Sequence, residues 1–388
     1  MLDRELIRQE FGYLGDHAYL NASMVGMPPK RVLDAARRFM DDYVASFNDN
    51  IKSDLLAKRN LAKQRFAQLI GAEASEISFQ KNVTESLSTF AMGYRALTPG
   101  TNAIIVDCDF PNCIYPWINA HHVRGFALKV YRSERGQVNA DELISMMDEN
   151  TRVLSLSMVT SCWGCRVDLE TLGRVCRARG IAFVVDAVQG LGRLALDAKR
   201  CNIDYLCCGG YKGMMGTWGA AFVYCDSRTG IVREITPPTA GYQSATGHHL
   251  APEVTTEFDE IDFRDDVNRL EAGSQCTYAI ESVGLGASLL LELGPEEVER
   301  QVLALDRRAR AGLKDLPIDV ITPDDPARLS GVVVSFFPKE KTDALKAALQ
   351  AHLVHANVRP GYLRITIAVY NTERDIDAFL AAVRDVFA

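Results

Sequence analysis

The chain of 388 residues is 47% hydrophobic, which is enough apolar material for the cores of one large and one smaller domain. Its formal net charge of −7, without any basic stripe, excludes nucleic acid as an expected partner. No stretch approaches the roughly 20 apolar residues of a membrane span, and the charged N-terminus lacks the apolar core of a signal peptide, so we expect a cytoplasmic protein without a membrane partner.

The first 225 residues predict helices followed by an alternating region. A helix is expected at the start of the chain, a loop over 24–29, and helices from Lys30 and over 53–71. Short apolar strands then alternate with helices. The strands are expected at 77–79, 101–106, 127–131, 152–157, 181–186, 205–208 and 220–224, and the helices at 84–96, 112–122, 140–148 and 168–179. This alternation predicts an α/β fold with a mostly parallel seven-stranded sheet covered by helices on both faces.

The rest of the chain predicts a smaller α+β domain. Residues 226–268 lack clear periodicity and are expected to form an irregular excursion. Helices are expected at 278–293, at 295–313 and from Thr372, and strands at 331–336 and 363–367. We expect residues 20–265 to form the large domain, and residues 1–19 with 266–388 to form the small domain.

All ten cysteines lie between Cys108 and Cys276. Their irregular spacing, partly within apolar runs, predicts reduced thiols. Cys162 and Cys165 have the two-residue spacing of a redox or zinc pair, but no second pair with metal-ligand spacing follows. We therefore expect no metal site.

Asp186 closes the predicted strand 181–186, and Gln189 follows three residues later. Open α/β sheets bind ligands at the carboxyl ends of their strands. A carboxylate there can pair with the protonated nitrogen of a pyridine cofactor and keep the ring an electron sink. Gln189 can hydrogen-bond a phenolic oxygen on the same ring. The alternative is that Asp186 only caps the next helix.

Lys212 lies in the glycine-rich turn CGGYKG between two apolar strands, 26 residues after Asp186. A desolvated lysine can lose its proton and attack an aldehyde. The alternative is an ordinary solvated surface charge. An acid at one strand end and a lysine at the next strengthen each other as evidence for a cofactor site.

The segment KNVTES, residues 81–86, opens a predicted helix. The N–H groups and dipole of a helix N-terminus favour an anion, and Thr84 and Ser86 add hydroxyl donors. The alternative is a simple capping arrangement between Asn82 and Glu85.

These motifs together resemble the class V aminotransferase family. The resemblance rests on NVTES, DAVQGLG and DYLCCGGYKGMMGTWGAAFVY, and later on RLEAGS at 269–274, LRIT at 363–366 and YNT at 370–372. It extends over roughly residues 18–388. The family includes cysteine desulfurases, selenocysteine lyase, kynureninase and isopenicillin N epimerase-like enzymes. The resemblance implies fold type I, pyridoxal 5′-phosphate (PLP) as cofactor, and a homodimer with shared active sites.

The resemblance also implies roles around the cofactor ring. Lys212 would carry PLP as a Schiff base, Asp186 would pair with the pyridine nitrogen, and Gln189 would contact the phenolic oxygen. Phe110 would stack on the ring where cysteine desulfurases have a histidine, and Ser161 stands where the family usually has an asparagine.

At the phosphate, the resemblance implies Thr84 and the backbone that follows it at Glu85, together with Tyr211 just before the lysine. Ser274 would reach the phosphate of the neighbouring subunit.

Arg364 matches the family's substrate-carboxylate arginine, and a guanidinium binds a carboxylate bidentately. The alternative is an edge-strand surface arginine. Further substrate contacts are expected from loop residues near the cleft. The candidates are Asn21, Ser23, Arg233, Tyr242, His248 and His249.

Two departures from the family narrow the expected reaction. Residues 277–388 contain no cysteine, so the persulfide nucleophile of the desulfurases is missing. A phenyl ring at Phe110 can pack on the cofactor but cannot transfer protons, which leaves Lys212 as the general base. The sequence predicts a PLP-dependent lyase acting on the Cβ–S bond of a cysteine S-conjugate. The alternatives are an aminotransferase, an epimerase, a decarboxylating oxidative deaminase, or a dimeric scaffold without catalysis.

Overall fold

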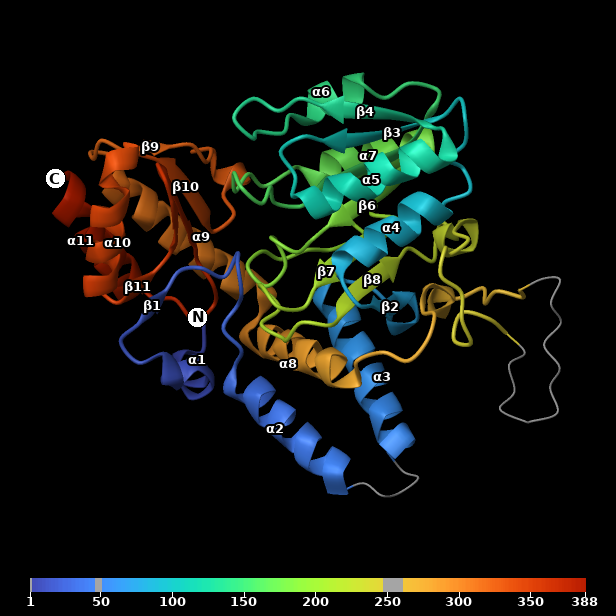
Figure 1. Ribbon diagram of the computed structural model, residues 1–388, viewed down its shortest axis with the longest axis horizontal. Coiled ribbons are helices and arrows are strands. Elements are labelled where there is room, and N and C mark those ends of the chain that lie inside the picture. The colour runs from blue at the N-terminus through green and yellow to red at the C-terminus, as the bar shows by residue number, and fades with distance from the viewer. Residues whose placement is uncertain (1, 46–50, 247–260) are drawn as a thin grey trace.

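A computed structural model describes residues 2–45, 51–246 and 261–388 (Figure 1). The seven strands predicted before residue 225 form one sheet with the order β2-β8-β7-β6-β5-β3-β4. The strands are β2 (Ile77–Gln80), β3 (Asn102–Val106), β4 (Ala127–Tyr131), β5 (Thr151–Ser157), β6 (Ala182–Asp186), β7 (Tyr205–Gly209) and β8 (Ala221–Cys225). The strand β8 runs antiparallel to its two neighbours, β2 and β7, and the other four strand pairs are parallel, which confirms the predicted mostly parallel sheet.

Helices cover both faces of this sheet because successive side chains of each strand point to opposite faces. On β3, for example, Ala103 and Ile105 face one core cluster, and Ile104 and Val106 face the other. The first cluster is closed by α4 (Val83–Gly93) and α5 (Pro111–Arg124), and the second by α3 (Ile51–Leu69), α7 (Leu169–Arg179) and α8 (Thr277–Leu293). No helix in the described part of the chain has the length and apolar character needed to cross a bilayer.

Local sequence signals set the helix ends. Proline occupies the first turn of α5, and Gly125 ends that helix in the left-handed conformation with φ of 79°. Asp168 caps the start of α7. The helix α6 (Ala140–Ser145) is shorter than the predicted 140–148, because the side chain of Asp148 accepts from the Asn150 amide and begins a turn.

A second, antiparallel sheet with the order β12-β13-β10-β9 is built by the C-terminal part of the chain. Its strands are β9 (Asp319–Val320), β10 (Val332–Phe336), β12 (Asn357–Arg359) and β13 (Tyr362–Thr366), and its helices are α9 (Pro295–Leu313), α10 (Thr342–Ala351) and α11 (Glu373–Phe387). This is the α+β character expected of the tail.

The two ends of the chain meet in this region. After α1 (Arg4–Phe11), the strand β1 (Ala18–Tyr19) pairs in parallel with β11 (Val354–His355). The N-terminal segment, blue in Figure 1, passes beside the C-terminal sheet and its helices before it enters α2 (Lys30–Ala45). Asn21 on this segment forms a bridge with Thr366 at the end of β13.

Candidate active site

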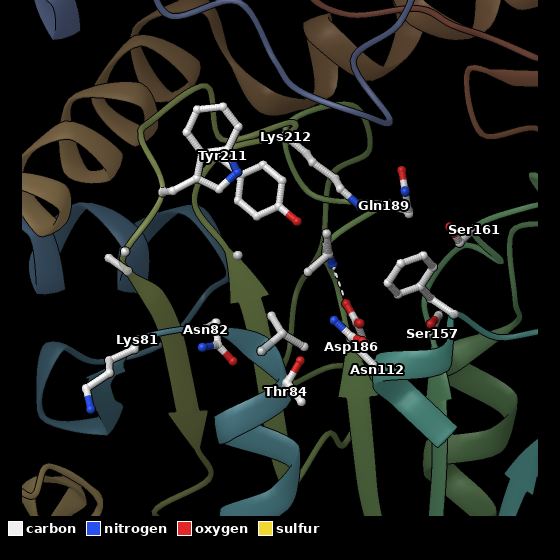
Figure 2. Close-up of a pocket in the computed structure, with 17 residues that line it drawn as sticks. Lys81, Asn82, Thr84, Asn112, Ser157, Ser161, Asp186, Gln189, Tyr211 and Lys212 are labelled. Carbon is white, nitrogen blue, oxygen red and sulfur yellow. Dashed lines mark hydrogen bonds between the residues drawn. The ribbon is translucent and has the colours of Figure 1, made fainter. Parts of the chain in front are cut away.

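A pocket opens at the carboxyl ends of β5, β6 and β7, where open α/β sheets bind ligands. Figure 2 shows Lys212 and Gln189 on one side of the pocket, and Asn82 and Thr84 on the opposite side. Seven of the predicted site residues line it: Thr84, Phe110, Ser161, Asp186, Gln189, Tyr211 and Lys212.

Asp186 is the last residue of β6 and is buried. Its Oδ1 accepts a hydrogen bond from the Val188 amide at 2.7 Å, and its Oδ2 accepts one from the Cys113 thiol at 2.8 Å. Burial raises the pKa of Asp186, and the Cys113 thiol, the Val188 amide and the nearby Lys212 cation oppose that rise. The hydrogen bond from the Val188 amide is the kind that a helix-capping aspartate would accept. Asp186 also lines the pocket, so it can contact a bound ligand as well.

Lys212 follows β7 and is 9% exposed. Its Nζ lies 5.6 Å from the ring centroid of Phe110 and 5.7 Å from that of Tyr211. Among the described residues, none accepts a hydrogen bond from Nζ or pairs with it. Burial lowers the pKa of Lys212, Asp186 opposes this shift, and Arg364 and Arg193 add to it. The side chain is therefore a buried amine with a weakened hold on its proton.

The backbone at Lys212 is fixed by the loop that contains Gly26. The Gly26 amide donates to the Tyr211 carbonyl at 2.8 Å. A Cβ on Gly26 would lie only 1.9 Å from the Lys212 carbonyl oxygen, so only glycine permits this approach.

The N-terminus of α4 forms the opposite side of the pocket. The Asn82 side chain accepts from the Glu85 amide at 2.8 Å, and the Glu85 carboxylate accepts from the Lys81 amide at 3.1 Å. The predicted capping arrangement is thus present, and it turns Glu85 away from the pocket. Asn82, Val83 and Thr84 at the start of the helix line the pocket, as Figure 2 shows for the Thr84 side chain.

Ser274 and Glu85 lie together in a neighbouring hollow, outside this pocket. The Ser274 hydroxyl is 3.4 Å from the Tyr242 hydroxyl. The predicted contact of Ser274 with the phosphate of a second subunit stays a prediction. Among the loop candidates, Arg233 forms a 3.7 Å ion pair with Asp265 at the surface, and His248 and His249 lie outside the described residues.

Arg364 is buried on β13, so it is not the exposed surface arginine of the alternative interpretation. Its Nη1 donates to the Ser161 carbonyl at 2.7 Å, and Ser161 itself lines the pocket. Within the described residues, the Nε of Arg364 and the Oδ1 of Asn21 are buried without hydrogen-bond partners. Neither Arg364 nor Asn21 lines the pocket itself, so contact with a ligand stays a prediction for both residues.

Several residues near the pocket could not be recognised from the sequence. Cys113 lies under Asp186, Trp218 stacks on Tyr211 with centroids 5.6 Å apart, and Arg193 contacts Gln189. Burial raises the pKa of Asp109 to about 7.

Comparison with known proteins places this geometry in context. The model of the family described as Aminotransferase class-V matches residues 18–379. A probable cysteine desulfurase of Pyrococcus abyssi is 24% identical, with 98% of this chain and 97% of that protein covered. An isopenicillin N epimerase of Streptomyces clavuligerus is 26% identical, with 94% and 93% covered.

A solved complex of the cystine C–S lyase C-DES with its reaction product cysteine persulfide superposes with a TM-score of 0.84. The identity is 22%, and 97% of this chain and 100% of that chain are covered. This likeness confirms the predicted fold type I.

Proposed function

Because the chain belongs to the aminotransferase class-V family, whose cofactor is PLP, we propose that it is a PLP-dependent lyase that cleaves the Cβ–S bond of a cysteine S-conjugate. The observation that carries the proposal is that one pocket holds both the buried Asp186 and the buried Lys212, whose Nζ has no hydrogen-bond or ion-pair partner among the described residues. The chain also has no cysteine after Cys276. The relatives named as a cystine C–S lyase and as cysteine desulfurases support cleavage of a carbon–sulfur bond.

The residues of the pocket fit PLP. Lys212 would bind the aldehyde carbon, Asp186 would hold the pyridine nitrogen, and Gln189 would face the phenolic oxygen. Thr84 and the N-terminus of α4 would receive the phosphate. When bound, PLP supplies an electron sink for negative charge that develops at the substrate Cα.

The substrate carboxylate has a binding partner in Arg364, whose buried Nε lacks a partner among the described residues. A guanidinium can fix a carboxylate in one orientation through two parallel hydrogen bonds. The adjacent Ser161 carbonyl holds the Arg364 side chain in place. Arg364 thereby orients the substrate within the pocket.

Once the amino group of the substrate has taken the place of Lys212 on the cofactor, the released amine of Lys212 would remove the proton on Cα. Its lowered pKa keeps a larger share of the amine neutral than in a solvated lysine, and a neutral amine is a competent base. Phe110, which lines the pocket beside it, has no ionisable group. The proton held by Lys212 can then be delivered to the departing sulfur, so that a thiol leaves from Cβ.

A persulfide mechanism requires a reactive thiol near the substrate. Eight of the ten cysteines are buried, and only Cys162 and Cys276 are exposed. Cys162 directly follows Ser161 and is the thiol to examine first. Burial raises the pKa of Cys113 and Cys208, which makes these thiols poor nucleophiles.

The test is a substrate panel of cystine, S-alkyl cysteines, cysteine and serine with PLP-loaded protein. We expect pyruvate, ammonia and free thiol in equal amounts from the S-alkyl cysteines, and cysteine persulfide in place of the thiol from cystine. Serine should turn over more slowly, and Lys212→Ala should turn over none of them. Borohydride reduction and peptide mapping should tag Lys212, and mass spectrometry after cysteine treatment should find no persulfide on any thiol.

The alternatives predict different products. An aminotransferase would convert PLP to pyridoxamine phosphate and require a keto acid, and an epimerase, which the Streptomyces clavuligerus relative keeps open, would only invert Cα. Either outcome without thiol release would overturn the lyase. A persulfide that disappears in Cys162→Ser would instead assign a desulfurase mechanism to that loop.

A further inference from the structure

Arg193 lies directly behind Gln189 as seen from the pocket. It is 1% exposed, and its Nη2 donates to Gln189 Oε1 at 3.1 Å. Because a guanidinium can only donate hydrogen bonds, this contact requires the carbonyl oxygen of the Gln189 amide to face Arg193. The Nε2 of Gln189 must then point away from Arg193.

The other side of the same amide is also held. Gln189 Nε2 donates to the Ser23 carbonyl at 3.3 Å, and the Ser23 hydroxyl lies 2.6 Å from the Thr366 hydroxyl. The amide is therefore clamped between the turn after β6 and the N-terminal segment. A side chain held by such surrounding contacts needs no further ordering when a ligand binds.

The charge on Arg193 is not balanced by a neighbouring acid. It forms no ion pair with any described residue, and its Nε and Nη1 are buried without hydrogen-bond partners there. Burial, and then repulsion from Arg364, lowers the pKa of Arg193 to about 10, so the group still carries its charge at neutral pH. An unpaired buried cation is costly, and an anion bound nearby would offset that cost.

We propose that Arg193 is a positioning residue that fixes the Gln189 amide with Nε2 available to the phenolic oxygen of PLP, and that its charge favours the anionic form of that oxygen. The inference rests on the proposed binding of PLP at Lys212, but not on the lyase reaction. It assigns a function to a buried charge that the reaction itself does not use.

The test is a pH titration of the absorbance of PLP bound to Lys212, without substrate. The proton that titrates lies on the nitrogen that links Lys212 to PLP, beside the phenolic oxygen. A nearby cation lowers the pKa of that proton, so removing the charge of Arg193 should raise it. We expect Arg193→Met to raise it by about one unit, as for the loss of one nearby charge, and Arg193→Lys to raise it by less than half as much. Arg310→Met is the matched control, since Arg310 is also buried but pairs with Asp306 in the small domain.

The same titration in a Gln189→Ala background separates positioning from simple charge. We expect Gln189→Ala alone to raise this pKa. In that background, adding Arg193→Met should raise the pKa by much less than it does in the wild-type protein. If Arg193→Met raised the pKa equally with and without Gln189, the positioning role through Gln189 would be refuted. If Arg193→Met does not fold, the same comparison can be made with Arg193→Lys.

A normal absorbance band with an unshifted pKa in the Arg193 variants would overturn the inference and leave the lyase intact. Shifted pKa values without thiol release from any S-conjugate would support the inference and refute the lyase.

Discussion

Gly26→Ala is the substitution whose effect follows most directly from the structure. The added Cβ would lie 1.9 Å from the Lys212 carbonyl oxygen, and real Cβ contacts essentially never fall below 3.0 Å. The two backbones must therefore separate by about 1.1 Å, which also strains the hydrogen bond from the Gly26 amide to the Tyr211 carbonyl. Overpacking of this kind costs about 1–3 kcal/mol of stability.

The substitution should also slow the reaction, because a displacement of about 1 Å at a reacting group can lower the rate about 100-fold. We expect Gly26→Ala to stay folded, with kcat/KM reduced about 100-fold in a thiol-release assay. Gly12→Ala is the matched control, since Gly12 has an ordinary φ of −58° and a Cβ added there would have no atom within 4 Å. Wild-type kinetics in Gly26→Ala would refute the described approach of the loop to Lys212.

Four further predictions follow from the same site. Asp186→Ala should keep the fold but lose most activity, because an unprotonated pyridine is a poor electron sink; near-normal turnover would mean that the ring lies elsewhere. Arg364→Lys should raise KM strongly, since an ammonium cannot form the bidentate pair; an unchanged KM would contradict this role. Burial raises the pKa of Asp109 to about 7, so the folded protein holds a proton that the unfolded chain releases. The stability contributed by that proton is lost as the pH rises from about 4 to 7, and Asp109→Asn should flatten the change in melting temperature over this range. Sedimentation should find a dimer whose activity falls in Ser274→Ala; a fully active monomer would exclude a shared site.

The sheet could be predicted from sequence because its central strands β3, β6, β7 and β8 are buried on both faces and consist largely of apolar residues. Asp186 and Lys212 could be paired because each follows such a run, and the carboxyl ends of neighbouring strands meet at one edge of the sheet. The length of α6 could not be predicted as well, because its end depends on the side-chain turn at Asp148 rather than on hydrophobic period.

The remaining features of the pocket depend on tertiary contacts. Arg364 lies 203 residues from the Ser161 carbonyl that it contacts, so only the family resemblance, and no local pattern, pointed to it. Cys113 could not be identified from the sequence, because a cysteine in an apolar segment has the pattern of an ordinary core residue. Only the structure shows that its thiol donates to Asp186. The capping alternative at Asn82 and Glu85 is confirmed, and Thr84 nevertheless lines the pocket.

The contacts of the N-terminal segment set an order for biosynthesis. The seven strands of the large sheet all lie within the first 225 residues. This sheet can therefore assemble while the ribosome is still translating the C-terminal part of the chain. The bridge from Asn21 to Thr366 and the contact of Ser23 with the same residue must wait until β13 has emerged. A nascent chain therefore contains Lys212 before the Ser23 contact that holds the Gln189 amide is supported by Thr366. We expect stable binding of PLP only after the finished polypeptide has been released.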